Sequence, residues 1–123
     1  MILVDTSIWI DHLRKSDELL SDLLDRKQVL IHPYVLGELA LGSLRHRDRI
    51  LRDLQDLKRT VVAHPDEVLR FIQQERLFQT GIGYVDAHLL AALRLTPEAW
   101  LWTRDRRLDA LAERLSLKAR LTH

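Results

Sequence analysis

Short apolar segments alternate along the chain with longer ones whose apolar residues recur every three or four positions. The first segment is apolar throughout and leads directly into Asp5-Thr6-Ser7, residue types that favour the start of a helix. By the same pattern, the sequence predicts strands at residues 1–4, 29–31, 60–62 and 100–103, and a last short one at 118–121. Strands that are apolar on both faces are typical of a parallel sheet covered by helices on each side.

Segments with helical spacing follow the predicted strands. They predict helices at residues 7–14, 17–26, 33–44, 45–58, 66–78, 85–93 and 105–115. Residues 85–93 are apolar apart from Asp86 and His88, so this helix is expected to be buried. Because strands alternate with helices, we expect right-handed crossovers and an α/β fold, with a central parallel sheet and helices on both faces.

The composition fits a single soluble domain of 123 residues, with 46% apolar and 30% charged residues. There is no cysteine, which excludes a disulfide framework and a thiolate metal site. No apolar run is long enough to span a bilayer, and no basic segment precedes the first apolar residues, so we expect a cytoplasmic protein without membrane contact. The net charge is only +1, but gathering four acids in one pocket would leave +5 on the remainder, a distribution that suits a polyanionic partner.

Four acids stand out by their positions. Asp5 follows the first predicted strand and Asp105 follows the fourth, so both belong at the carboxyl edge of the sheet, where ligands of such folds bind. Asp86 opens the most apolar helix, and Glu38 lies on a helix with an apolar face. Each has an ordinary alternative role, since aspartate caps helices and favours their first turn, but a carboxylate on an apolar face is unfavourable unless it is paired.

If the four acids converge, they need cations. Two carboxylates about 5 Å apart repel by roughly 3 kcal/mol at an effective dielectric constant near 20. A site made only of oxygen ligands selects hard ions such as Mg²⁺ or Mn²⁺, which activate water in phosphodiester cleavage. Thr6, Ser7 and Thr103 adjoin these acids and either orient the ligands or simply cap helices, and the sequence leaves both roles open.

Four segments, in order along the chain, carry a family resemblance. They are LVDTSIWI at residues 3–10, PYVLGEL at 33–39, GYVDAHLLAA at 83–92 and WTRDRRL at 102–108. Together they resemble PIN-domain ribonucleases, and more closely the VapC toxins of bacterial type II toxin–antitoxin systems. The resemblance covers essentially the whole chain, as a single PIN domain over residues 1–123.

This resemblance implies a three-layer α/β/α sandwich and a Mg²⁺- or Mn²⁺-dependent endoribonuclease that uses a metal-activated water. It assigns the acidic metal pocket and the residues that line it as follows: Asp5, Glu38, Asp86 and Asp105, with Thr6, Ser7 and Thr103. It also implies a homodimer, a cognate antitoxin that wraps the toxin and obstructs the pocket, and a structured RNA substrate such as transfer or ribosomal RNA.

Basic residues occur at two places. Arg104, Arg106 and Arg107 flank Asp105, and arginines beside the pocket could hold RNA phosphates on either side of the scissile one. The basic segment at residues 45–52 is better interpreted as a solvated helix face that forms ion pairs with its own aspartates.

A few further residues lie near the motifs. Asp109 is one helical turn beyond Asp105 and could add an acid to the pocket, but a solvated aspartate is the favoured interpretation. The resemblance requires no histidine, so His12, His32 and His88 are predicted to be structural or surface residues.

Two non-catalytic kinds of protein share some of these features with a ribonuclease. A receiver-type signalling domain requires paired acids after the first strand, an aspartate after the third and a lysine after a late strand, and all three are missing. A PIN-like interaction module that binds a basic peptide or RNA through its acidic pocket stays open, because the same acids would serve it. Dependence on Mg²⁺ or Mn²⁺ would distinguish the enzyme from this module.

Overall fold

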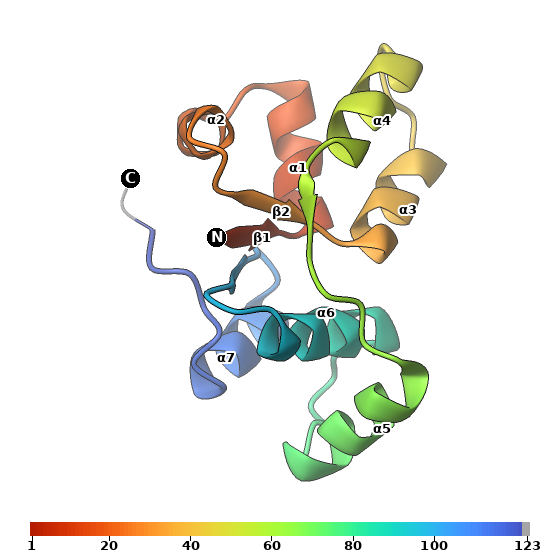
Figure 1. The fold of residues 1–123 in the computed structure, drawn as a ribbon, viewed down its shortest axis with the longest axis vertical. Helices are drawn as coiled ribbons and strands as arrows, with labels where there is room; N and C mark the ends of the chain where they lie inside the picture. Colours follow the sequence, from red (N-terminus) through yellow and green to blue (C-terminus); the bar gives the residue numbers. More distant parts are fainter. Residues whose placement is uncertain (122–123) are drawn as a thin grey trace.

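A computed structural model describes residues 1–121 and places a parallel sheet between two layers of helices (Figure 1). The strands are β1 (Ile2–Val4), β2 (Val29–Ile31), β3 (Lys58–Arg59) and β4 (Trp100–Trp102). The helices are α1 (Thr6–Arg14), α2 (Glu18–Asp25), α3 (Pro33–Leu41), α4 (Arg47–Gln55), α5 (Pro65–Gln74), α6 (Tyr84–Leu95) and α7 (Arg106–Arg114). The predicted single domain extends to His123, and its last two residues lie outside the described part.

The strand order is β3-β2-β1-β4, and every pairing is parallel. Leu3 pairs with Leu30 on one side and with Leu101 on the other, which makes β1 the centre of the sheet. All residues of β1 and β2 are buried, as expected for strands covered on both faces. The α/β prediction and its three-layer arrangement are therefore confirmed.

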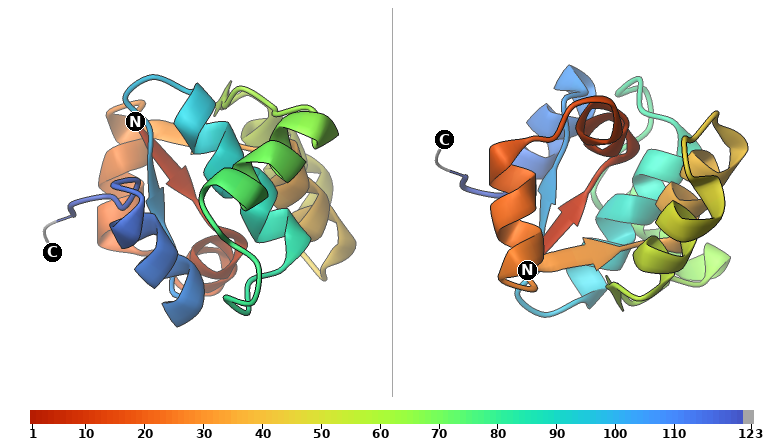
Figure 2. Two further views of the ribbon diagram at one scale, coloured as in Figure 1. Left: turned by 90° about the horizontal axis from the view of Figure 1, so that it is seen from below. Right: turned by 90° about the horizontal axis from the view of Figure 1, so that it is seen from above.

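The connections divide the helices into two layers. Seen from above the sheet, α1 to α4 lie in front; seen from below, α5, α6 and α7 lie in front (Figures 1 and 2). This division follows from right-handed crossovers, because the chain steps from β1 to β2 and β3 in one direction and then returns past β1 to β4. The reversal of direction places β4 beside β1.

Helix α6 forms much of the core beneath the sheet. Its residues from Ala87 to Leu93 are all buried, with Leu89 and Leu90 completely inaccessible. It packs against α5 on one side and β4 on the other. The predicted buried helix is confirmed, and it extends by one residue at its start and two at its end. Each fully buried leucine of this kind contributes about 2 kcal/mol of hydrophobic stabilisation.

The third strand lies two residues earlier than predicted. The β-branched residues Thr60, Val61 and Val62 favour a strand, yet the ladder ends when the Thr60 amide donates to the carbonyl oxygen of Ile31 at 3.1 Å. The next amide, of Val61, donates instead to the Thr96 hydroxyl at 2.9 Å, which turns the backbone out of the sheet. Val61 and Val62 are consequently 45% and 48% exposed.

Two further predictions were too long. The helix predicted at 66–78 ends at Gln74, because Arg76 has a left-handed φ of 54° that stops helical hydrogen bonding. The strand predicted at 118–121 is only an isolated parallel bridge between Leu101 and Lys118. The remaining predicted ends differ from the observed ones by at most three residues. Among the described helices, none combines the length and apolar character that a membrane crossing requires.

Candidate metal centre

The carboxyl edge of the sheet has a topological switch point between β1 and β4. The chain leaves β1 toward β2, whereas β4 arrives on the opposite side of β1. Loops after such strands diverge to opposite faces and leave a crevice between them, which is where open α/β sheets bind ligands. Asp5 follows β1 directly, and Thr103 to Asp105 follow β4, so the sequence places acidic groups on both sides of this crevice.

A hollow of about 460 Å³ opens at this point. It is lined by Asp5, Thr6, Ser7, Ile10, Glu38, Asp86, Arg104 and Asp105. The four predicted acids thus come together from four separate parts of the chain: the β1–α1 junction, α3, α6 and the start of α7. Thr103 is buried just behind the lining, at the end of β4.

Asp5 is held by two protein donors. The Thr6 amide donates to its Oδ1 at 2.9 Å, which caps α1, and the Thr103 hydroxyl donates to its Oδ2 at 2.7 Å. The same Thr103 hydroxyl oxygen accepts the Asp105 amide at 3.0 Å. One threonine therefore links the ends of β1 and β4 and fixes the orientation of the Asp5 carboxylate, which is only 9% exposed.

Glu38 and Asp105 are oriented in similar ways. The Thr6 hydroxyl donates to Glu38 Oε1 at 3.0 Å, and the Leu108 amide donates to Asp105 Oδ1 at 2.9 Å, which caps α7. Asp105 thus combines the capping role with a place in the hollow. These hydrogen bonds position the carboxylates before any ion binds.

The expectation that burial forces Glu38 to have a partner is wrong. Its helix face is apolar, but that face is open to solvent: Tyr34 is 38% exposed, Leu41 is 91% exposed, and Glu38 itself is exposed. No burial penalty therefore forces Glu38 to have a partner. It lies in the hollow because α3 starts at the end of β2 and passes beside α1.

The electrostatic effect of the hollow is clearest in the raised pKa of Asp86. Burial, together with the charges of Asp5, Asp105 and Glu38, raises the pKa of this carboxyl to about 6, against a hydrogen bond from the Gly83 backbone that lowers it. The acids are therefore close enough to repel one another. Near neutral pH, a cation would relieve this repulsion and favour the charged form of Asp86.

The donor set fits a hard divalent ion. Within residues 1–121, no group of three or more acidic or histidine side chains is arranged to hold a metal ion, so the site has no cage of protein ligands alone. Mg²⁺ rarely uses such a cage, since it keeps several waters and binds through one or two carboxylates. The Ser7 hydroxyl also lines the hollow, and it is buried without a hydrogen-bond partner. Carboxylates with a spare hydroxyl are the chemistry that Mg²⁺ or Mn²⁺ prefers.

The three arginines that follow β4 differ in their surroundings. Arg104 lines the hollow, where its Nε donates to Asp11 at 2.8 Å and its guanidinium lies 3.9 Å from Asp17. Arg107 reaches the carbonyl oxygen of Gly81 at 3.5 Å. Arg106 is exposed. The sequence argument missed the aspartates that hold Arg104, although Asp11 lies one helical turn after Ser7 and could have been placed on the same face.

Asp109 and the histidines lie outside the lining. Asp109 forms an ion pair with Lys118 at 3.0 Å. His32 caps α3 by accepting the Tyr34 amide at 3.0 Å, and burial lowers its pKa to about 4. His88 is buried against the Tyr34 and Tyr84 rings, and burial also lowers its pKa. His12 accepts the Asp17 amide at 3.0 Å. Each histidine therefore contributes to local structure.

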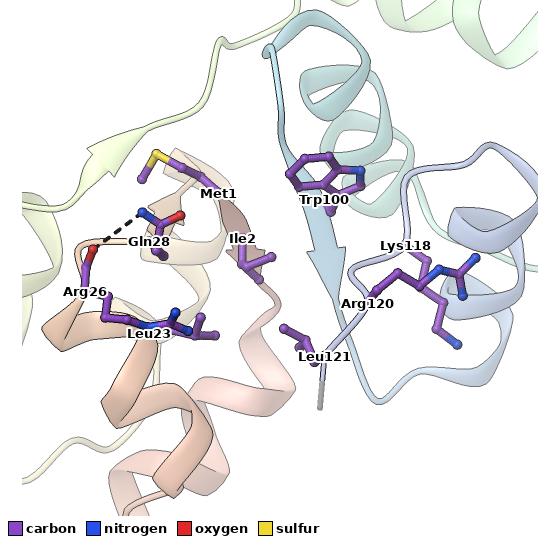
Figure 3. A pocket seen from close by; sticks show the side chains of 9 residues that line it. All are labelled: Met1, Ile2, Leu23, Arg26, Gln28, Trp100, Lys118, Arg120 and Leu121. Carbon is purple, nitrogen blue, oxygen red and sulfur yellow. Dashed lines mark hydrogen bonds between the residues drawn. The ribbon is translucent and has the colours of Figure 1, made fainter. Parts of the chain in front are cut away.

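A larger hollow of about 700 Å³ lies at the opposite edge of the sheet, where the strands begin (Figure 3). Its lining includes Met1, Trp100, Arg26 and Arg120 and contains no carboxylate. Figure 3 shows Arg120 and Lys118 leading away from the centre of this hollow. Without acidic ligands, it does not compete with the carboxyl edge as a site for divalent cations.

Comparison with known proteins agrees with this geometry. Residues 2–114 match the PIN domain family, which covers the sheet and all seven helices. Two relatives named Ribonuclease VapC32, from Mycobacterium tuberculosis strains CDC 1551 / Oshkosh and ATCC 25618 / H37Rv, are each 50% identical over 110 residues. The alignment covers 89% of this chain and 89% of each relative. The chain therefore belongs to the PIN-domain family and, within it, to the VapC group.

Proposed function

We propose that this protein is a Mg²⁺- or Mn²⁺-dependent endoribonuclease and the toxin of a type II toxin–antitoxin system. The observation that carries the proposal is the convergence of Asp5, Glu38, Asp86 and Asp105 at the switch point, where burial and the neighbouring acids raise the pKa of Asp86 to about 6. The name of its relatives, Ribonuclease VapC32, indicates RNA as the substrate.

The divalent ion, when bound, would supply an activated water and would neutralise charge on the phosphodiester. One or two of Asp5, Glu38, Asp86 and Asp105 would bind the ion directly, and the others would bind the waters that it keeps. Thr103 keeps Asp5 in place, and Thr6 keeps Glu38 turned toward the hollow. Because ion binding favours the charged form of Asp86, it would release a proton from that carboxyl at pH values near 6.

The arginines after β4 would contact RNA phosphates. Arg104 is the best placed of the three, because it lines the hollow and its side chain is still 48% exposed. Its ion pair with Asp11 holds the guanidinium at the edge of the acidic hollow, where it would meet a phosphate bound to the ion. Arg106 and Arg107 would contact phosphates farther from the cut.

The VapC group also suggests the setting in which the protein acts. We propose that it works in the cytoplasm as a homodimer, that its substrate is a structured RNA such as transfer or ribosomal RNA, and that a cognate antitoxin inhibits it by obstructing the pocket.

The test uses purified protein, free of antitoxin, with total bacterial RNA in Mn²⁺ or in EDTA, followed by mapping of the cut ends. Discrete cuts that need the metal and disappear with Asp5→Asn are expected. The Asp109→Asn variant is the matched control, because it removes an equivalent charge outside the hollow and should cut normally. Uncut RNA from folded protein in both Mn²⁺ and Mg²⁺ would favour a binding module over an enzyme.

A further inference from the structure

A second hollow adjoins the acidic one. It has a volume of about 830 Å³ and lies among α1, α3 and α4, the helices that gather at the upper right of Figure 1. Ile10 and Glu38 line both hollows, so the two are continuous across these side chains. A substrate bound at the metal centre can therefore continue into this groove without leaving the surface.

The charge of this groove is opposite to that of the metal centre. Arg14, Arg45 and Arg49 line it, and within residues 1–121 none of the three forms an ion pair or a side-chain hydrogen bond. Glu38 is the one carboxylate in the lining, and the Thr6 hydroxyl turns it toward the acidic hollow. The groove thus presents three exposed guanidinium groups whose charge no neighbouring side chain neutralises.

This arrangement differs from the expected solvated helix face. In the basic segment at residues 45–52, only Arg47 pairs with an aspartate, Asp48, at the long distance of 3.9 Å. Arg45 and Arg49 instead face the groove together with Arg14 from α1. Three cations, from α1, α4 and the turn before α4, on one concave surface indicate an anionic ligand.

Apolar side chains share the lining of the groove with the arginines. They are those of Leu13, Leu39, Leu44 and Ile50. Grooves that bind single-stranded nucleic acid combine cations along the phosphate backbone with aromatic side chains on which the bases stack, and in this groove aliphatic side chains would contact the bases instead. An extended strand would thus place its phosphates toward the arginines and its bases toward the leucines.

We propose that this groove binds the RNA strand on one side of the scissile phosphate, as a substrate track that leads out of the metal centre. This inference rests on the proposed ribonuclease function. The track has a direction, since the groove and the acidic hollow share Ile10 and Glu38 and therefore join on one side of the metal centre. It therefore binds nucleotides on either the 5′ or the 3′ side of the cut, and not on both.

The first measurement compares RNA lengths. A core oligonucleotide of about four nucleotides around a mapped cut is prepared, together with versions extended by about four nucleotides at the 5′ end or at the 3′ end. Binding is measured with the Asp5→Asn protein in Mg²⁺, so that the RNA stays intact. One extension should tighten binding about tenfold or more, and the other should have little effect.

The second measurement removes the arginines. The Arg14→Gln/Arg45→Gln/Arg49→Gln variant should lose the gain from that extension and keep the affinity for the core oligonucleotide. Its plot of log Kd against log salt should be less steep by about 2, the value expected when three contacts to single-stranded phosphates are lost. The matched control, Arg26→Gln/Arg70→Gln/Arg120→Gln, removes the same charge outside both hollows and should keep the extension gain.

The outcomes separate the two proposals. If the wild-type protein cuts no RNA, the proposed function fails. If it cuts RNA but the groove variant keeps both the extension gain and the salt slope, the track is wrong while the ribonuclease stands. If the groove variant binds RNA normally but loses affinity for an acidic peptide or for the antitoxin, the groove belongs to a protein partner, and the track is again wrong.

Discussion

At the scale of single residues, the Thr103 hydroxyl makes two hydrogen bonds that connect separate parts of the metal centre. It donates to Asp5 and accepts the amide of Asp105, so it joins two acids that are 100 positions apart in sequence. The sequence placed Thr103 beside an acid but left open whether it orients ligands or caps a helix. The structure shows its hydrogen bond to Asp5, which neither helical spacing nor composition encodes because it depends on the pairing of β1 with β4.

The Thr103→Val substitution should therefore weaken both folding and cleavage. Valine has the same shape but leaves the buried Asp5 oxygen without its donor, and hydrogen bonds to charged groups contribute about 1.5 to 3 kcal/mol. Urea unfolding should show a loss of this size, and kcat for RNA cleavage should fall. Thr103→Ser keeps the hydroxyl and is the control. Normal cleavage by Thr103→Val would remove this residue from the site.

Asp86 should make stability depend on pH in the absence of metal. Its folded pKa of about 6 lies above the ordinary value of 3.8, so the folded state holds the proton more tightly than the unfolded state. The contribution of this protonated carboxyl to the free energy of unfolding is fully present below pH 3.8 and is lost as the pH rises through 6. In EDTA at pH 7.5, Asp86→Asn should be more stable than wild type by about 1 to 2 kcal/mol, a figure reduced for solvent screening.

The pH dependence is the check on that prediction. The advantage of Asp86→Asn should shrink as the pH falls and should disappear near pH 4, because wild-type Asp86 is then protonated as well. Asp22→Asn is a suitable control, since Asp22 lies on α2 at the surface in an ion pair with Arg26. An advantage that stays constant from pH 4 to pH 8 would show that charge repulsion is not its cause.

At the scale of elements, the sequence predicted best where burial was most complete. Residues 85–93 are apolar apart from Asp86 and His88, and Ala87 to Leu93 are all buried, so the local sequence pattern agrees with the tertiary environment. The third strand was misplaced because its ladder depends on where β2 ends. Thr60-Val61-Val62 has the right composition for a strand, but Ile31 is the last residue of β2 to which it can bond.

Helix α6 should be the element that is destabilised most when a buried side chain is shortened. Leu90→Ala removes a completely buried side chain from this helix and should cost about 2 to 5 kcal/mol of unfolding free energy. Leu95→Ala, at the 41% exposed end of the same helix, should cost much less and serves as the control. Chemical denaturation of both variants tests this difference, and equal losses would contradict the described packing of α6.

At the scale of the whole molecule, a net charge near zero is combined with a strong separation of negative and positive side chains. The net charge is +1, yet four acids gather in one hollow, and three arginines line the groove that continues from it. Asp5 and Asp105 were predictable because carboxyl ends of parallel strands meet at one edge, whereas the places of Glu38 and Asp86 beside them were implied by the family resemblance alone. The arginine groove was not predictable, because it depends on how α1 and α4 flank α3, and this contact leaves no periodic signal in the sequence.

Mg²⁺ should stabilise the whole fold if the acids bind it. An ion that binds only the folded state adds about 2.7 kcal/mol at one hundred times its Kd, and Tm rises by roughly 3 to 5 °C per kcal/mol for a domain of this size. Thermal unfolding in increasing Mg²⁺ should show this rise in wild type. The Asp5→Asn/Asp86→Asn variant should lose most of it, and an undiminished rise would place the ion elsewhere.

The hydrogen bonds that hold the carboxylates have a consequence for how the ion binds. Backbone amides or threonine hydroxyls orient Asp5, Glu38, Asp86 and Asp105 in the fold itself. The conformational entropy of ordering these ligands is therefore lost during folding and not during ion binding. Crystals grown with and without the ion should superpose closely at the hollow. The affinity for the ion would then contain no cost of ordering these ligands, and it would be set by the charges of the acids at this end of the sheet and by the water that the ion gives up.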